Sequence, residues 1–250
     1  FVNPVKIPQM ADAEELVRRL PPIDGVTYSA LTLNMRGLER AQAAGIQAVE
    51  VSISASDTHS RKNTGMSHKQ ALEQGVRMVR LAADYHMHVR LSIQCAFGCV
   101  YEGNLASSKI IEIISDMYKV GNIATLCLAD TTGMANPRAV RSLVPDVQAL
   151  VDSVPVALHL HDTRGMGLAN VYAALTCGVT YFDTSLGGIG GCPFVDGAAG
   201  NIATEDTVHM LEAIGVATGI DISTVSSCSQ QLAHFLDKPL PGKIYKLPVP

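Results

Sequence analysis

The sequence has no long hydrophobic run and no excess of positive charge. Nowhere in its 250 residues is there an uninterrupted apolar run of about 18 residues, so a transmembrane helix is not expected. Its 19 Lys and Arg residues are outnumbered by 23 Asp and Glu residues, and the formal net charge at pH 7 is -4. This balance gives no electrostatic reason to expect a nucleic acid or an anionic membrane as a partner.

The sequence also lacks an initiator Met and the cysteine spacing of a small secreted domain. Its six cysteines are scattered through mostly apolar segments, which favours a reducing compartment. We predict a cytoplasmic location, with the mitochondrial matrix as the alternative. The first residues, Phe1-Val2-Asn3-Pro4, read as the middle of a longer chain, so any targeting segment is expected to lie upstream.

What the sequence does contain is a regular alternation of strand and helix patterns, in a composition that is 47% hydrophobic and 17% charged. Apolar, β-branched segments predict strands at residues 26–33, 47–53, 89–95, 123–129, 154–158 with the HLHD that follows, and 179–185. Amphipathic segments predict helices at residues 11–20, 38–44, 67–85, 107–120, 137–151, 166–177, 204–214 and 222–236. Residues 54–65 are predicted to form a polar loop, and the tail from Pro239 onward to be extended.

Six strands, each followed by a helix, predict a parallel sheet with right-handed crossovers. The polar and Gly-rich loops follow the strands, which is typical of an α/β fold of the (β/α)8 or TIM barrel kind, with its site at the carboxyl end of the strands. Six units leave such a barrel two short, and an open sheet would expose two long apolar edges. We therefore predict a single barrel domain over residues 1–250 whose first two β/α units are missing from this chain or not shown in it. Residues 220–250 would form a C-terminal helix and extended tail. A doubly wound sheet is the alternative, although no G-x-G-x-x-G follows an early strand.

Two histidines end the fifth predicted strand. Because side chains two residues apart on a strand point to the same side, His159 and His161 should converge. They would make half of a divalent-metal site, with Asp162 able to orient them by hydrogen bonding. The alternative is two histidines satisfied in the polar end of a barrel. The pair His86 and His88 precedes its strand instead, which predicts a structural role on the opposite face.

Other polar residues are expected on the same rim because they also end strands. They are Asn34, Cys95, Asp130, Thr184 and Ser185. Asn201 lies just before the helix predicted to start at Thr204, and its amide oxygen is a ligand type that Mg2+ or Mn2+ accepts. Its alternative role is that of an ordinary loop or capping residue.

A loop with four glycines surrounds Cys192. Residues 186–193 read LGGIGGCP, and such a loop can open and close over a site. A thiol there can donate or accept a proton, since a nearby cation lowers its pKa. The alternative is an incidental loop cysteine.

Five stretches carry a resemblance that covers almost the whole chain. They are CAFGCVYEG at 95–103, ADTTG at 129–133, HLHDT at 159–163, GGIGGCP at 187–193 and GNIATED at 200–206. Together they resemble the 3-hydroxy-3-methylglutaryl-CoA lyase family, within the wider group of metal-dependent aldol and Claisen barrels. The Gly-rich loop and GNIATED are specific to the family, whereas H-x-H-D-T is shared with the wider group.

The resemblance implies a Mg2+- or Mn2+-dependent lyase that cleaves 3-hydroxy-3-methylglutaryl-CoA into acetyl-CoA and acetoacetate. It implies that His159, His161 and Asn201 are metal ligands. It also implies that Cys192 moves a proton at the acetyl-CoA carbon and that Asp130 lies near the reacting hydroxyl. Residues expected to contact the substrate or support the site are Asn34, Asp162, Arg164, Gly190, Gly191 and Glu205. An acyl-CoA is the implied ligand, and a homodimer the implied assembly.

The chain departs from the family pattern in two respects. The family's first strand carries an Arg-Asp pair and its second strand a Glu, and none of these is found here. This polypeptide by itself is therefore expected to lack a metal ligand and its main cationic group, and to be inactive without upstream residues. Arg164 follows H-D-T where the best-known family members have an aromatic residue. The substrate could therefore be a related 3-hydroxy-3-acylglutaryl-CoA.

Three rival functions are weighed against the lyase. A metal-dependent hydrolase barrel would carry its H-x-H on the first strand and further His ligands on later strands. Here H-x-H comes late, and the one predicted strand that follows ends near Asp183 without a His. An enzyme that condenses an acyl-CoA with a 2-keto acid would have a long C-terminal region and no Gly-Gly-x-Gly-Gly-Cys-Pro loop. The non-enzymatic alternative is an inactive barrel kept as a binding module.

Overall fold

The computed structural model describes residues 1–5, 7–191, 195, 197 and 199–248, and the chain forms two compact units. Unit 1 comprises Phe1–Ala96, Leu105–Leu128 and Asp146–Val156. Unit 2 comprises Phe97–Asn104, Ala129–Pro145 and Ala157–Pro250. Each unit is therefore assembled from separate stretches of the chain. Two of the boundaries lie in the loop between β3 and α5, and the other three fall inside β4, α6 and β5.

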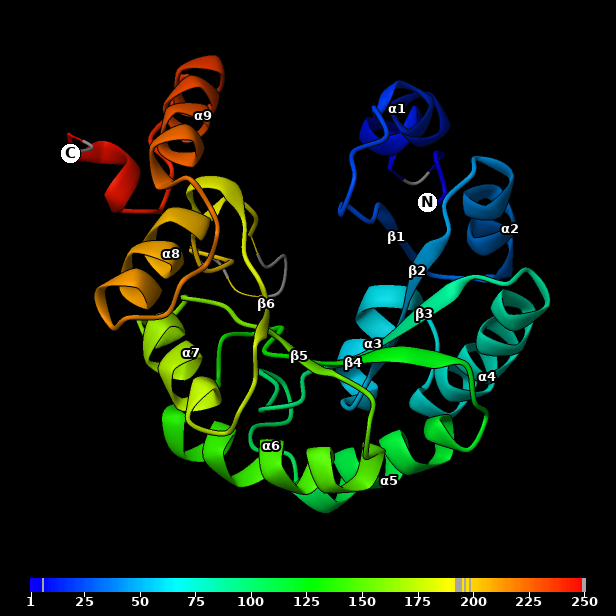
Figure 1. Ribbon diagram of the computed structural model, residues 1–250. Coiled ribbons are helices and arrows are strands. Elements are labelled where there is room, and N and C mark those ends of the chain that lie inside the picture. Colours follow the sequence, from blue (N-terminus) through cyan, green and yellow to red (C-terminus); the bar gives the residue numbers. More distant parts are fainter. Residues whose placement is uncertain (6, 192–194, 196, 198, 249–250) are drawn as a thin grey trace. The chain divides into compact units, whose positions relative to one another are not determined.

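Strands and helices alternate as predicted (Figure 1). The strands are β1 (Ser29–Thr32), β2 (Ala48–Ser54), β3 (His88–Gln94), β4 (Ile123–Ala129), β5 (Val156–His159) and β6 (Tyr181–Asp183). The α-helices are α1 (Ala13–Arg19), α2 (Met35–Ala43), α3 (Asp57–Thr64), α4 (His68–Asp84), α5 (Ser107–Tyr118), α6 (Pro137–Val151), α7 (Gly167–Leu175), α8 (Thr204–Ala213) and α9 (Ile222–Phe235). The 3-10 turns among the described residues are η1 (Pro8–Met10), η2 (Leu186–Gly188) and η3 (Ile244–Lys246).

Unit 1 is built on parallel strands that follow one another in chain order. Thr32 of β1 pairs with Val51 of β2, Val51 with Leu91 of β3, and Leu91 with Leu126 of β4. Burial alternates along most of β2, whereas residues 91–93 of β3 and 126–129 of β4 are buried without a break, as expected for parallel strands that are covered on both faces. Helix α4 covers β2 closely: a Cβ on Gly75 would lie only 2.8 Å from Ile53 Cδ1.

Unit 2 brings the ends of β4, β5 and β6 together. The Asp130 amide donates to the His159 carbonyl at 2.8 Å, and β5 pairs in parallel with β6 so that His159 lies beside Asp183. Helix α7 contacts α8, and α8 contacts α9 (Figure 1). The strand order is β1 to β6 and every described pairing is parallel, so the prediction of a parallel sheet is confirmed.

Three local predictions differ from the structure. Residues 54–65 were expected to form a loop, but residues 57–64 form helix α3, because Ser56 caps its first turn and Gly65 ends it with φ 78°. Helix α2 begins at Met35, since Asn34 caps it by accepting a hydrogen bond from the Gly37 amide. The tail from Pro239 is not extended throughout, because it contains η3.

Strands β1, β5 and β6 are shorter than predicted, and several other boundaries follow the sequence closely. Strand β4 and helix α6 have the predicted limits, and α4 opens with the capping box between Ser67 and Gln70. Within the described part of the chain, none of the helices combines the length and apolar content that a bilayer crossing needs.

Candidate active site

The two histidines at the end of β5 converge as their spacing predicts. His159 Nε2 lies 3.1 Å from His161 Nε2, and the ring planes are inclined at 61°. The rings meet edge to face, and the two Nε2 atoms are within hydrogen-bonding distance of each other. A separation of about 3 Å is what two adjacent ligands of an octahedral ion have when each lies about 2.1 Å from the metal.

Asp183 holds the His159 ring from the neighbouring strand. Its Oδ2 lies 3.2 Å from His159 Nδ1, at the position where the parallel register sets the two residues side by side. With the Nδ1 proton directed to this carboxylate, His159 Nε2 keeps its lone pair for a ligand. The sequence prediction assigned this orienting role to Asp162 and missed Asp183. The available signal was that β6 is the strand next to β5 and ends in a carboxylate.

His161 is a neutral imidazole. It is 7% exposed, and burial together with the nearby His159 lowers its pKa to about 4. Its Nδ1 has no hydrogen-bond partner among the described residues. A ring that stays neutral in the physiological range keeps a nitrogen lone pair available, as a metal ligand requires.

Asn201 lies directly across from His161. Their backbones form an isolated antiparallel bridge, and the Asp162 amide donates to the Gly200 carbonyl at 2.8 Å. The Asn201 side chain donates from Nδ2 to the Ile189 carbonyl at 3.0 Å. Its Oδ1 is buried without a donor among the described residues. A buried amide oxygen left without a donor is costly unless a ligand satisfies it.

Asp130 is a buried carboxyl at the end of β4. It is 1% exposed, and burial raises its pKa to about 7 even though the backbone amides of Ala135 and Met134 lower it. Oδ1 accepts from the amides of Met134 and Ala135 at 2.6 and 2.9 Å, whereas Oδ2 has no partner among the described residues. A group that titrates near neutral pH is suited to general acid–base work.

Asp162 and Arg164 serve the surrounding loops. Asp162 Oδ1 accepts from the Gly167 amide at 2.8 Å and so holds the start of α7. Arg164 Nη1 donates to the carbonyls of Thr132 and Gly133 at 2.8 and 2.7 Å, which fastens the loop that follows Asp130. Neither of these sets of hydrogen bonds reaches the two histidine rings.

The remaining candidates in unit 2 lie along the Gly-rich loop. A Cβ on Gly190 would lie 2.5 Å from Asn201 Nδ2, so glycine is needed for this approach, whereas Gly191 has open space. Glu205 is 1% exposed and accepts the Gly187 amide on both oxygens, at 3.1 and 3.0 Å. It therefore supports the start of the loop. Cys192 lies outside the described residues.

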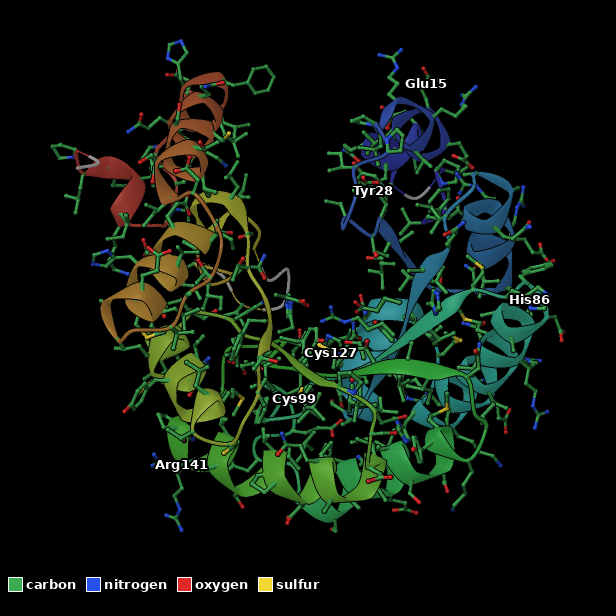
Figure 2. The ribbon with its side chains drawn as sticks, viewed as in Figure 1. Glu15, Tyr28, His86, Cys99, Cys127 and Arg141 are labelled. Carbon is green, nitrogen blue, oxygen red and sulfur yellow. The ribbon has the colours of Figure 1, made fainter. Side chains whose placement is uncertain are left out.

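The candidates in unit 1 have local roles. Asn34 caps α2 through the Gly37 amide. His86, labelled in Figure 2, occupies the turn between α4 and β3 with φ 55°, and His88 begins the strand. The separate, structural role predicted for these two histidines agrees with that position at the amino end of β3.

Within the described residues, no group of three or more His, Cys, Asp and Glu side chains converges as a metal site. The described donor set is therefore two imidazoles with an amide oxygen nearby. Two imidazoles, an amide oxygen and a buried carboxyl that titrates near pH 7 could together hold an oxygen-rich ligand and move a proton on it.

Comparison with known proteins gives consistent matches. The family model described as HMGL-like matches residues 5–232. The hydroxymethylglutaryl-CoA lyase YngG of Bacillus subtilis (strain 168) is 38% identical over 243 residues, which cover 97% of this chain and 81% of that protein. The mitochondrial hydroxymethylglutaryl-CoA lyase of Gallus gallus is 35% identical over 244 residues, covering 98% of this chain and 82% of that protein.

Solved structures agree with these relatives. The crystal structure of the Bacillus subtilis HMG-CoA lyase has a TM-score of 0.93 and 38% identity, covering 98% of this chain and 82% of that chain. An HMG-CoA lyase from Acinetobacter baumannii, in complex with coenzyme A and 3-methylmalate, has a TM-score of 0.93 and 36% identity, covering 100% of this chain and 84% of that chain. The predicted barrel class is thereby confirmed.

Proposed function

The chain belongs to the HMGL-like family, and from that premise we propose that it is a carbon–carbon lyase. The proposed reaction cleaves 3-hydroxy-3-methylglutaryl-CoA into acetyl-CoA and acetoacetate. The observation that carries the proposal is the convergence of His159 and His161 at 3.1 Å at the end of a strand, in a chain whose relatives are curated as hydroxymethylglutaryl-CoA lyases. The coenzyme A bound in the Acinetobacter relative supports an acyl-CoA ligand.

The residues of the site fit a divalent metal ion. The spacing of the two Nε2 atoms suits adjacent ligands of one ion. The buried Asn201 Oδ1 has no hydrogen-bond donor among the described residues, and a bound cation would satisfy this oxygen. We propose His159, His161 and Asn201 as protein ligands for Mg2+ or Mn2+, with Asp183 orienting the His159 ring. When bound, the ion supplies Lewis-acid stabilisation of negative charge on the substrate oxygens.

Side chains of the protein would carry out the two proton transfers of the reaction. Cleavage requires that the tertiary hydroxyl lose its proton, that the bond between C2 and C3 break, and that C2 of the departing acetyl-CoA gain a proton. We propose that Asp130 takes the hydroxyl proton, because its pKa of about 7 leaves an accepting fraction at neutral pH. The prediction that Cys192 delivers the proton to C2 rests on its place in the Gly-rich loop sequence.

The direct test is an assay of the full-length protein. Purified protein is incubated with 3-hydroxy-3-methylglutaryl-CoA, first with Mg2+ and then with EDTA, and acetoacetate and acetyl-CoA are measured. Equal amounts of both products that depend on the metal are expected. Bound Mn2+ with no product from any acylglutaryl-CoA would refute the lyase and favour a binding module.

Arg164 gives a reason to test a second substrate class. Its guanidinium is anchored by two backbone carbonyls in the loop after Asp130, at a position where the best-known lyases have an aromatic residue. A related 3-hydroxy-3-acylglutaryl-CoA is therefore the second candidate. The kcat/KM values of a panel of such thioesters decide between the candidates. A higher kcat/KM for a substrate with a longer acyl group would identify that thioester, instead of 3-hydroxy-3-methylglutaryl-CoA, as the substrate.

Assembly and location complete the proposal. We predict a homodimer, which light scattering of the purified protein tests directly. We also predict a cytoplasmic site of action, which fractionation of the source cells tests. Neither prediction is needed for the chemistry proposed above.

A further inference from the structure

Residues 240–246 near the C-terminus, here called the C-terminal brace, are folded back and anchored by two buried side chains. Leu240 is 2% exposed and Tyr245 is 4% exposed. The Leu240 amide donates to the Tyr245 hydroxyl at 2.7 Å, and Gln230 of α9 donates to the Tyr245 carbonyl at 2.8 Å. These bonds close the brace into a small loop and fasten it to α9.

Two neighbouring carboxylates at the start of α8 fix the brace to the Gly-rich loop. Asp206 is 7% exposed and accepts the amides of Lys243 and Ile244 at 2.9 and 2.8 Å. Glu205 accepts the Gly187 amide and the Ser229 hydroxyl. In the first turn of α8, Asp206 therefore binds the brace and Glu205 binds η2.

The brace also contacts η2 directly. The Gly242 amide donates to the Gly187 carbonyl at 2.8 Å. Gly187 has φ 59°, and a Cβ built on it would lie 2.3 Å from Leu240 Cδ1. Leu240 thus fills the space that the missing side chain of Gly187 leaves open, and the two segments meet without a gap.

A short series of hydrogen bonds leads from η2 to Asn201. The Gly188 and Ile189 amides donate to the carbonyls of Ser185 and Leu186 at 3.0 and 3.1 Å. The Ile189 carbonyl, two residues beyond Gly187, accepts from Asn201 Nδ2 at 3.0 Å. This bond fixes which end of the Asn201 amide group is the free oxygen, because Nδ2 is already committed.

The geometry points to the C-terminal brace as a positioning element for Asn201: through Gly187 and Ile189 it holds the side-chain amide so that Oδ1 is the ligand atom. The inference rests on the proposed function for the role of Asn201 in metal binding, whereas the bracing itself does not depend on that function. Leu240 and Tyr245 are positioning residues, since neither belongs to the proposed ligand set.

The test uses two variants of the full-length protein, each with a matched control. Leu240→Ala removes the contact with Gly187, and its control is Leu247→Ala, a leucine of the same tail that is 55% exposed. Tyr245→Phe deletes only the hydroxyl that closes the brace, and its control is Tyr172→Phe, a tyrosine that is 52% exposed. Thermal unfolding confirms that each variant is folded.

Two readings are taken without metal. Hydrogen–deuterium exchange reports on the amides of residues 187–189, and the 15N side-chain signal of Asn201, assigned by its loss in Asn201→Ser, reports on the bond to Ile189. In both brace variants we expect exchange at least about tenfold faster and a shifted, less protected Asn201 signal, with the controls unchanged. An unchanged Asn201 signal in the folded variants overturns the inference, whether or not exchange rises.

Mn2+ titration then distinguishes a failure of the proposed metal-binding function from a failure of the inference about the brace. In Leu240→Ala the affinity should fall by about 10- to 100-fold, the usual cost of losing a group that orients a ligand. If the unaltered protein binds no Mn2+, the proposed function fails, while the metal-free readings still decide whether the brace holds Asn201. If Mn2+ affinity is equal in variant and control, the brace does not position a ligand and the inference is wrong.

Discussion

The burial of Asp130 predicts a specific dependence of stability on pH. Its folded pKa of about 7 lies above the reference value of 3.8, because burial disfavours the ionised form. The stabilisation from the neutral carboxyl is therefore complete below about pH 3.8, is lost as the pH rises towards 7, and is absent above that. A shift of about three pKa units corresponds to about 4 kcal/mol, which is a large part of the stability of an ordinary domain.

Asp130→Asn isolates this effect. The amide oxygen can still accept from the Met134 and Ala135 amides, and the amide nitrogen replaces Oδ2, which has no partner among the described residues. The variant resembles the neutral acid at every pH. Its free energy of unfolding, relative to the unaltered protein, should therefore rise by about 4 kcal/mol between pH 4 and pH 8.

The measurement is urea denaturation at several pH values in EDTA, which removes bound divalent ions. Asp146→Asn, at an exposed position on α6, is the control for removing one negative charge. Parallel stability curves for Asp130→Asn and the unaltered protein would show that Asp130 ionises freely in the fold. The desolvation argument, and with it the proposed role of Asp130 as a base near neutral pH, would then be refuted.

Three further predictions concern the metal and the thiol. His161→Ala should weaken Mn2+ binding by more than about 100-fold, because a ligand is lost. The control variant His86→Ala should leave Mn2+ binding unchanged. Equal Mn2+ affinities of the two variants would remove His161 from the ligand set. Asp183→Ala should weaken Mn2+ binding by about 10- to 100-fold by releasing the His159 ring, and an unaltered Kd would contradict the orienting role. Cys192→Ser should lower kcat by about 10²- to 10⁴-fold without changing the Mn2+ affinity. Cys228→Ser, at an exposed cysteine, is the control. An undiminished kcat in Cys192→Ser would show that Cys192 has no catalytic role.

The fold was largely predictable because its signals are local. The limits of β4 and α6 coincide with the apolar run and with Pro137 at the start of the helix. Helix α3 was missed because its sequence, DTHSRKNT, has no apolar face to display a helical period. The capping residue Ser56 and the terminating Gly65 were the signals that could have found it.

The sequence predicted those features of the site that follow from a residue's position at the end of a strand. Placement at a strand end correctly predicted that His159 and His161 converge. Asp162 was given the orienting role because it is adjacent in sequence, yet its carboxylate caps α7. Asp183 performs the contact instead, and finding it requires the register between β5 and β6. Register between distant segments depends on packing that no single segment contains.

The way the two units share the chain has a consequence for how the protein is made. Unit 1 needs the stretch Asp146–Val156, and unit 2 starts at Phe97 yet needs residues up to Pro250. Neither unit is a contiguous piece of the chain. Part of unit 2 is synthesised before unit 1 is finished, so both depend on contacts between distant stretches, which form slowly. Three of the boundaries fall inside β4, β5 and α6, so sites for splitting or permuting the chain are better sought in its loops.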